Sequence, residues 1–284
     1  MRWINIWKSA VLLLLAACSP ITFANRMISR TGYHVVNDVA YGKDPRQKLD
    51  FYVPDHPTGP VLLFFYGGGW QGGTKSLYPA FGQAFATKGI LVAIADYRIY
   101  PQVRYPEFIK DSAQAFAYVH AHAAQYGANP KQLIVAGHSA GAYDAMMLAA
   151  DPRYLKDASA DLSQICGVIG IAGPYDFLPL TDPSYIAVFE GNDRRESQPI
   201  NYIDGKRPPM LLAYGTSDTV VDPGNSVRMA AKLRSFGSTV RLKAYPNTGH
   251  VGIILSLIPG LRWMTPLRAD MLDFIASATT DCES

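Results

Sequence analysis

Residues 133–141, Leu-Ile-Val-Ala-Gly-His-Ser-Ala-Gly, decide the fold. Their first four residues form a continuous apolar run, as expected of a strand buried on both faces of a sheet. The motif G-x-S-x-G follows directly, with Ser139 at its centre, and leads into the small-residue stretch AGAYDAMMLAA at 140–150. Small residues on both sides of Ser139 suit a tight, strained turn between a strand and a helix. The alternative is an ordinary turn with a capping serine, but the setting favours a nucleophile elbow.

Apolar runs and helical patterns alternate along the rest of the chain. This alternation predicts an α/β fold with a mostly parallel sheet of about eight strands, covered by helices on both faces. Two early strands without a helix between them predict an antiparallel edge, and the polar segment 176–208 predicts a small cap inserted between two strands. The strands are expected at 34–41, 48–53, 61–66, 90–95, 133–136, 167–172, 210–214 and 240–245, and the main helices at 76–88, 107–125, 140–150, 225–236 and 267–278.

Length and composition fit one domain. The 284 residues are 49% hydrophobic and 17% charged, which is a globular composition with enough chain for a large core. The formal charge is only +3, and part of it lies in an N-terminal segment that we expect to be removed. No cluster of Lys and Arg marks a nucleic-acid surface, so we exclude nucleic acid as a partner.

The N-terminus predicts export. Residues 1–17 combine Arg2 and Lys8 with the apolar run 10–17, which is too short to span a bilayer but typical of a signal peptide. The sequence Leu-Ala-Ala-Cys ending at Cys18 resembles the lipobox of bacterial lipoproteins, in which the cysteine is acylated. This resemblance implies a lipid-anchored envelope protein with a tether at 18–32 and a folded domain at 33–284. Ser19 resembles outer-membrane sorting in Gram-negative lipoproteins. The alternative is an ordinary cleaved signal that happens to contain Cys18.

Two further cysteines leave two interpretations open. Cys166 opens a predicted core strand, and Cys282 lies in the polar C-terminal tail. In an oxidising compartment they could form a disulfide, or one could be a buried inert thiol and the other a loose tail thiol. The sequence alone does not place their Cα atoms within bonding distance.

A glycine cluster follows the strand predicted at 61–66. In Tyr66-Gly67-Gly68-Gly69-Trp70, three glycines are costly unless the backbone must approach a ligand closely. Here the chain resembles the esterase/lipase branch of the α/β-hydrolases, which carries HGGG or HGGGW at this point. The resemblance covers roughly 48–278, and Asp96-Tyr97-Arg98 also matches it. It implies an oxyanion hole made by the N–H groups of Gly68, Gly69 and Ala140. Tyr66 replaces the family histidine, so the bracing of the loop is expected to differ.

The catalytic base and acid follow from position along the chain. His250 lies directly after a predicted strand, whereas His138 is adjacent to Ser139 and cannot readily reach its hydroxyl. The order serine, acid, histidine in this fold then requires an acid before His250 and after a strand. Asp218 in Gly215-Thr216-Ser217-Asp218 is our choice. Asp222 is the alternative acid, although we prefer to assign it a helix-capping role.

These residues predict a serine hydrolase that attacks a small or aromatic carboxylic ester through an acyl-enzyme. The resemblance extends to kynurenine formamidase-like and to feruloyl and acetyl esterases, so an aryl formamidase or amidase is the rival enzyme. A catalytically inactive envelope binding protein is the rival from another class. No metal or redox cofactor is implied.

The residues that line the pocket are left open by the sequence. Trp70, Tyr143 and Phe177 either line the pocket or belong to the core. The apolar stretch 251–258 lines the pocket, forms a membrane-facing lip or packs inside the protein.

Overall fold

An eight-stranded sheet organises residues 28–283, the part of the chain that the computed structural model describes. The strand order is β1-β2-β4-β3-β5-β6-β7-β8. β2 pairs antiparallel with both β1 and β4, and every pairing from β4 to β8 is parallel. The predicted α/β-hydrolase fold, with an antiparallel edge on a mostly parallel sheet, is confirmed. The strands are β1 (Tyr33–Ala40), β2 (Lys48–Pro54), β3 (Val61–Phe65), β4 (Leu91–Ala95), β5 (Leu133–His138), β6 (Gly167–Ile171), β7 (Met210–Gly215) and β8 (Val240–Tyr245).

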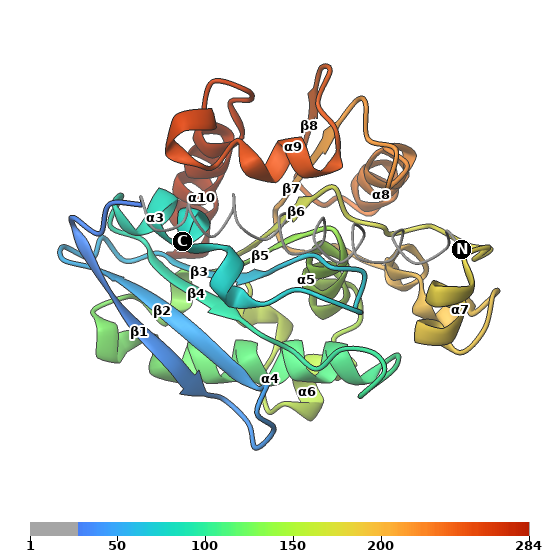
Figure 1. The fold of residues 1–284 in the computed structure, drawn as a ribbon, viewed down its shortest axis with the longest axis horizontal. Coiled ribbons are helices and arrows are strands. Elements are labelled where there is room, and N and C mark those ends of the chain that lie inside the picture. Colours follow the sequence, from blue (N-terminus) through green and yellow to red (C-terminus); the bar gives the residue numbers. More distant parts are fainter. Residues whose placement is uncertain (1–27, 284) are drawn as a thin grey trace, which may run out of the picture.

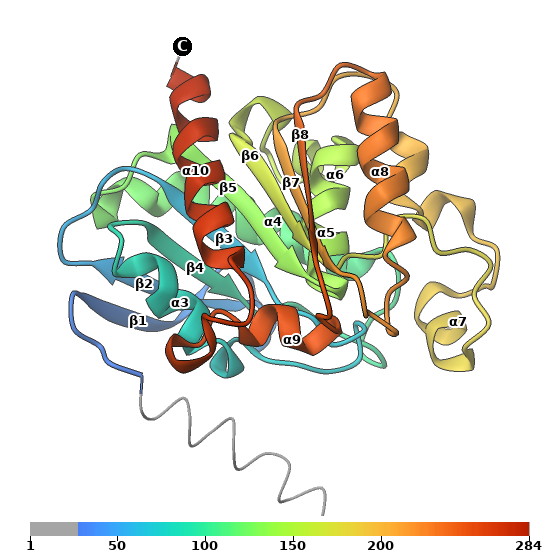
Figure 2. The same cartoon turned by 90° about the horizontal axis from the view of Figure 1, so that it is seen from above.

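Helices cover both faces of this sheet. Helices α3 and α10 lie on one side of it, and α4 and α5 lie on the other (Figure 1). Helix α8 packs against the edge strand β8 and its neighbour β7 (Figure 2). The helices are α3 (Pro79–Ala86), α4 (Glu107–His122), α5 (Ala140–Ala150), α6 (Arg153–Asp157), α7 (Pro183–Phe189), α8 (Gly224–Ser235), α9 (His250–Leu255) and α10 (Leu267–Glu283).

The core lies along the central strands. Every residue of β3, β4, β5 and β6 is buried, because helices exclude water from both faces of the sheet there. β8 is one of the two edge strands, and four of its six residues are only partly buried. The loops that follow the central strands are therefore held by a rigid support, and these loops carry the predicted site.

The helix expected at 76–88 is two separate elements. A 3-10 turn covers Lys75–Leu77, and α3 begins only at Pro79. Proline cannot donate a backbone hydrogen bond and is favoured in the first turn of a helix, so Pro79 starts a new helix instead of continuing the turn. The helix expected to end at 278 instead continues to Glu283.

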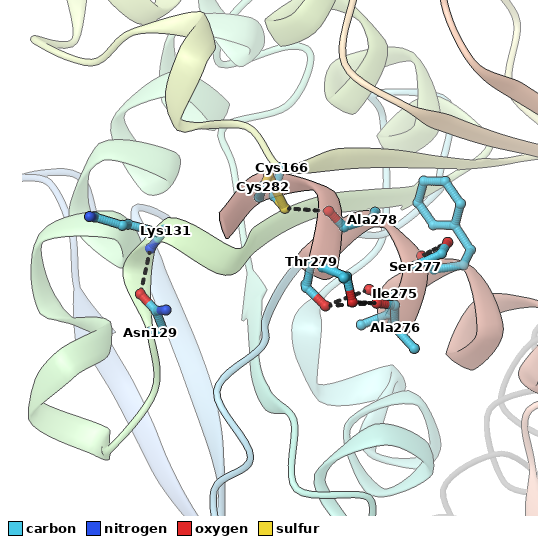
Figure 3. Close-up of a disulfide and its surroundings, with 11 residues drawn as sticks. Asn129, Lys131, Cys166, Ile275, Ala276, Ser277, Ala278, Thr279 and Cys282 are labelled. Atoms are coloured by element: carbon cyan, nitrogen blue, oxygen red, sulfur yellow. Dashed lines mark hydrogen bonds between the residues drawn. A yellow bond between two sulfur atoms is a disulfide. The ribbon is translucent and has the colours of Figure 1, made fainter. Parts of the chain in front are cut away.

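The longer α10 brings the two cysteines together. Cys282, on its last turn, forms a disulfide with Cys166, and their Cα atoms are 5.7 Å apart (Figure 3). Cys166 is buried, and its sulfur lies 3.2 Å from the carbonyl oxygen of Ala278. Of the two interpretations left open by the sequence, the structure has the paired one.

The segment 176–208 lies between β6 and β7 and contains no strand. It carries α7 and the 3-10 turns Arg195–Ser197 and Pro199–Tyr202. At the other end of the chain, the predicted signal peptide, Cys18 and most of the tether lie outside the described residues. Between residues 28 and 283, no helix combines the length and the apolar character that crossing a membrane requires.

Candidate active site

Ser139 occupies a sharp turn between β5 and α5. Its φ of 56° and ψ of −122° are unusual for a residue with a side chain, and its N–H donates to the carbonyl of Ile171 over 2.8 Å. A Cβ at Gly137 would collide with the backbone of Gly141, and a Cβ at Gly141 would collide with the backbone of Phe65. The two glycines of the motif therefore permit the close packing that presents the serine at the carboxyl end of the strand.

His250 lies within hydrogen-bonding distance of the serine. Its Nε2 is 2.8 Å from Oγ of Ser139, and its Nδ1 is 2.7 Å from Oδ2 of Asp218. The side chain of His250 is 9% exposed and that of Asp218 only 1%, so water hardly competes for these contacts. The sequence places His250 in a loop, whereas the structure makes it the first residue of the short helix α9.

Asp218 is held by the turn that follows β7. Its Oδ1 accepts the N–H groups of Val220 and Val221 at 2.9 and 3.0 Å, which leaves Oδ2 for the histidine. Asp222 makes different contacts. Its Oδ1 accepts the N–H of Gly224, the first residue of α8, and its Oδ2 faces Arg228. The structure thus brings Asp218, and not Asp222, to His250.

His138 contacts the backbone of the catalytic base, His250. It is 5% exposed, and its Nε2 lies 3.0 Å from the backbone carbonyl of His250. Because a carbonyl only accepts, Nε2 of His138 must carry the proton. Burial, with a smaller contribution from the neighbouring His250, lowers the pKa of His138 to about 3, so the ring is neutral at physiological pH. The sequence excluded His138 as a base but did not indicate this contact.

The glycine loop, residues 67–73, lies beside Ser139 and has unusual backbone geometry. Gly68, Gly69 and Trp70 have φ values of 147°, 60° and 57°. A Cβ on Gly67 would come within 2.8 Å of the Ser139 side chain, so only glycine permits this approach. Within residues 28–283, the N–H groups of Gly68, Gly69 and Ala140 donate to no other group of the chain. These amides are therefore available to a ligand beside Ser139.

Tyr66 braces this loop in place of the family histidine. Its hydroxyl donates to Oδ1 of Asp96 over 2.6 Å and accepts from Nη2 of Arg46 over 2.9 Å. The same guanidinium nitrogen of Arg46 donates to the carbonyl of Gly73 at the far end of the loop. The hydroxyl of Tyr97 also donates to the carbonyl of Tyr66. Of these residues, only Tyr66, Asp96 and Tyr97 belong to motifs that are evident in the sequence. Arg46 belongs to none of these motifs, so the sequence does not predict its contact with the loop.

A cavity of about 440 Å³ opens beside the nucleophile. Ser139, Gly69 and Ala140 contribute to its wall, and Gly68 does not. Trp70 and Phe177 line it, together with Tyr185 of α7, so the segment 176–208 forms one side of the cavity. Volumes of this size suit small-molecule ligands.

The other pocket candidates have structural roles. Tyr143 is fully buried, and its hydroxyl donates to the carbonyl of Ser197, so it belongs to the core. The stretch 251–258 is packing in part, since Ile253, Ser256 and Leu257 are buried, whereas Val251 is 57% exposed. None of this stretch lines the cavity.

Fold and geometry together define the class of the protein. A serine, a histidine and an aspartate converge at the carboxyl ends of parallel strands, beside free backbone amides, as in serine hydrolases with the α/β-hydrolase fold. The chain belongs to the BD-FAE family, whose model matches residues 49–233. That match includes Ser139 and Asp218 and ends before His250.

Curated relatives agree with this class. The chain is 29% identical to "Probable isoprenylcysteine alpha-carbonyl methylesterase ICMEL1" of Arabidopsis thaliana, over 78% of its own length and 52% of that protein. It is 31% identical to "Esterase LipC" of Mycobacterium tuberculosis, over 75% of its length and 58% of the relative. The chain thus spans only a little more than half the length of these two relatives.

Solved structures show the same fold. A truncated carbohydrate esterase from gut microbiota superposes with a TM-score of 0.76 at 22% identity, covering 89% of this chain and 99% of the other. An inhibited esterase B from Lactobacillus rhamnosis superposes with a TM-score of 0.78 at 17% identity, covering 98% of each chain. At these identities the likeness concerns the fold alone.

Proposed function

We propose that the chain hydrolyses carboxylic esters through an acyl-enzyme formed on Ser139. The observation that carries the proposal is the hydrogen-bonded series from Asp218 through His250 to Ser139, which ends at the wall of a cavity. A serine hydroxyl is a weak nucleophile until a base takes its proton, and His250 Nε2 is placed to do so. The esterase names of the relatives favour an ester as the substrate.

The proton transfers follow from the two contacts of His250, with Ser139 and with Asp218. His250 removes the proton of Ser139 as Oγ attacks the ester carbonyl, and the resulting imidazolium is stabilised by Asp218. The same proton then passes to the leaving alcohol. In the second half-reaction His250 takes a proton from the water that attacks the acyl-enzyme, and returns it to Oγ of Ser139 as the acyl–Oγ bond breaks and the carboxylic acid leaves. The oxyanion formed in each half is stabilised by the amides of Gly68, Gly69 and Ala140, and losing one such donor typically costs about 3–4 kcal/mol in the transition state.

The cavity favours a small or aromatic substrate. Its volume of about 440 Å³ fits an ester of modest size, and rings of Trp70, Phe177 and Tyr185 form part of the wall. Aromatic walls give an acyl or alcohol ring extensive contact with little loss of side-chain entropy. We therefore expect aryl and short-chain esters to be cleaved faster than long-chain esters.

The decisive experiment combines covalent labelling with turnover. A fluorophosphonate probe should label the wild-type protein and fail to label Ser139→Ala, and p-nitrophenyl acetate hydrolysis should disappear in the same variant. If the folded wild type takes up no probe, the chain is an inactive binding protein and the proposal is wrong. Strong preference for an aryl formamide over the matching aryl ester would instead assign the site to a formamidase.

We also propose that Cys18 anchors the protein to a membrane of the cell envelope after export. The support is the lipobox-like sequence that ends at this residue and the apolar run before it. Cys18→Ala is expected to move the protein from the membrane fraction to the soluble fraction of the cells that express it. Unchanged partitioning would contradict the anchor and would leave the esterase proposal intact.

A further inference from the structure

Asp144 is a buried carboxyl group that the proposed mechanism does not use. It lies on α5, one helical turn after Ala140, and has no exposed surface. Its Oδ1 accepts the indole N–H of Trp70 over 3.1 Å, and its Oδ2 has no hydrogen-bond partner within residues 28–283. A carboxyl group is costly to bury, and an apolar side chain of similar size would fill the same volume without that cost. Its contact with Trp70 therefore calls for a reason.

The contact holds the side chain of Trp70 in place. It directly follows Gly69 and has a φ of 57°, a conformation that a bulky side chain adopts only when its surroundings impose it. Rings of three core residues surround the indole, with centroids 4.9 Å away for Phe189, 5.1 Å for Tyr143 and 5.6 Å for Phe108. Ring packing excludes water but is weakly directional. The hydrogen bond to Asp144 is what fixes the indole nitrogen, and with it the rotation of the Trp70 side chain.

Burial favours the neutral form of this carboxyl group. Burial, with a smaller contribution from Asp111, raises the pKa of Asp144 well above its usual range, and the hydrogen bonds from Trp70 and Ser112 only partly oppose this shift. Both the neutral and the ionised carboxyl keep an oxygen that can accept the indole N–H, so the contact with Trp70 is compatible with either form.

We infer that Asp144 is a positioning residue for the oxyanion hole. Its bond to Trp70 connects the helix that supplies the Ala140 amide to the loop that supplies the Gly68 and Gly69 amides. These two sources of donors follow the ends of the neighbouring strands β3 and β5, which are paired up to Phe65 and Gly137, but beyond these residues the loop and the helix diverge. The Asp144–Trp70 bond adds a side-chain constraint to that pairing, across the loop–helix interface. This inference rests on the proposed esterase function, since it concerns the donors that the mechanism uses.

The expected effect is on turnover more than on substrate binding. Oxyanion donors act mainly on the charge that develops in the transition state, so their displacement lowers kcat and leaves KM nearly unchanged. Displacing groups by about 1 Å can cost about a hundredfold in rate. We expect Asp144→Leu to lower kcat for p-nitrophenyl acetate by about tenfold or more, with KM within about threefold of the wild type. Asp144→Asn keeps an Oδ1 acceptor and should retain kcat within about threefold.

A double-mutant cycle separates this role from simple core packing. Trp70→Phe removes the indole donor and should also lower kcat. Adding Asp144→Leu to Trp70→Phe should then cause little further loss, because the bond is already absent. Leu148→Ala is the matched control: Leu148 is buried on the same face of α5, one turn further from the loop. It should lower the melting temperature while leaving kcat within about twofold.

Several outcomes would overturn the inference. They are an unchanged kcat in Asp144→Leu, an equal kcat loss in Leu148→Ala, and fully additive losses in the cycle. If Asp144→Leu does not fold, the comparison of Trp70→Phe with Asp144→Asn decides, and an unchanged kcat in Trp70→Phe contradicts the role. A wild-type protein that hydrolyses no ester and takes up no fluorophosphonate would refute the proposed function itself, which is a different result from any of these.

Discussion

The hydroxyl of Tyr66 donates a hydrogen bond of 2.6 Å to Oδ1 of Asp96. The same carboxylate oxygen accepts the backbone N–H of Lys75 at 2.7 Å. Tyr66 precedes the glycine loop and Lys75 follows it, so a single carboxylate holds both ends of the loop. Burial raises the pKa of Tyr66, so its phenol keeps the proton that it donates. A tyrosine and an aspartate thus do here what a histidine is expected to do in related esterases.

Tyr66→Phe tests this brace. The substitution removes one hydroxyl from a fully buried ring and leaves the guanidinium of Arg46 and the carboxylate of Asp96 each short of a partner. We expect the free energy of unfolding to fall by about 1–3 kcal/mol, and kcat to fall with it, because the loop loses an anchor. Urea unfolding and ester turnover measure the two effects.

The matched control for this variant is Tyr41→Phe. The Tyr41 hydroxyl donates to the backbone carbonyl of the same Asp96, without touching the glycine loop. This variant should lose comparable stability and keep kcat within about twofold. Equal losses of kcat in the two variants would show that the effect of Tyr66 is on stability alone.

Asp218→Asn and Asp222→Asn form a second matched pair. Asp218 orients His250 and stabilises its cation, so the amide should lower kcat by about ten-thousandfold, the loss known for this change in serine proteases. Asp222 belongs to the cavity wall, but it contacts the start of α8 and Arg228 and not His250, so its amide should change kcat far less than the amide at 218 does. Steady-state turnover of p-nitrophenyl acetate decides, and a large loss in Asp222→Asn would reverse the assignment.

The sequence predicts the parts of the site that depend on local pattern. Ser139 and the glycine loop are marked by small residues that a turn or a close approach requires, and His250 and Asp218 are marked by their places after strands. The sheet is predictable for the same reason, because buried parallel strands appear as continuous apolar runs.

The remaining features depend on contacts between distant residues. Arg46 reaches Tyr66 and Asp144 reaches Trp70 only after β-strands far apart along the chain have paired. No periodicity in the sequence marks such contacts. The C-terminal helix shows the same limit, because its last turn is favoured by the tertiary disulfide at Cys282 as much as by local propensity.

His138 gives a prediction on stability and pH. Its pKa is lowered to about 3 in the folded protein, against about 6.5 in an unfolded chain. Below about pH 6.5 the unfolded chain binds a proton that the folded protein does not, so folding stability falls as the pH falls toward 3. At about pH 4.5 the loss from this group amounts to about 2–3 kcal/mol. Urea unfolding of the wild type and His138→Gln at about pH 7.5 and pH 4.5 measures it.

The change between the two pH values is the informative quantity. His138→Gln has its own stability cost, which is present at both pH values and cancels when they are subtracted. The buried carboxyl of Asp144, whose raised pKa acts in the opposite direction, is common to both proteins and cancels as well. The variant should therefore lose less stability than the wild type on acidification. Equal losses in the two proteins would contradict a buried neutral histidine at 138.

The disulfide gives the last prediction. Cys166 and Cys282 are 116 residues apart, so breaking the bond frees a long loop in the unfolded chain and should lower the free energy of unfolding by about 2–5 kcal/mol in Cys282→Ala. Cys166 precedes β6 and Ser139 follows β5, so the bond lies at the opposite end of the sheet from the nucleophile. Fluorophosphonate labelling at 25 °C should therefore be unchanged. Dithiothreitol should shift the wild-type urea midpoint toward that of the variant and leave the variant unaffected, and a wild-type midpoint that equals the variant's without reductant would show that the bond does not form.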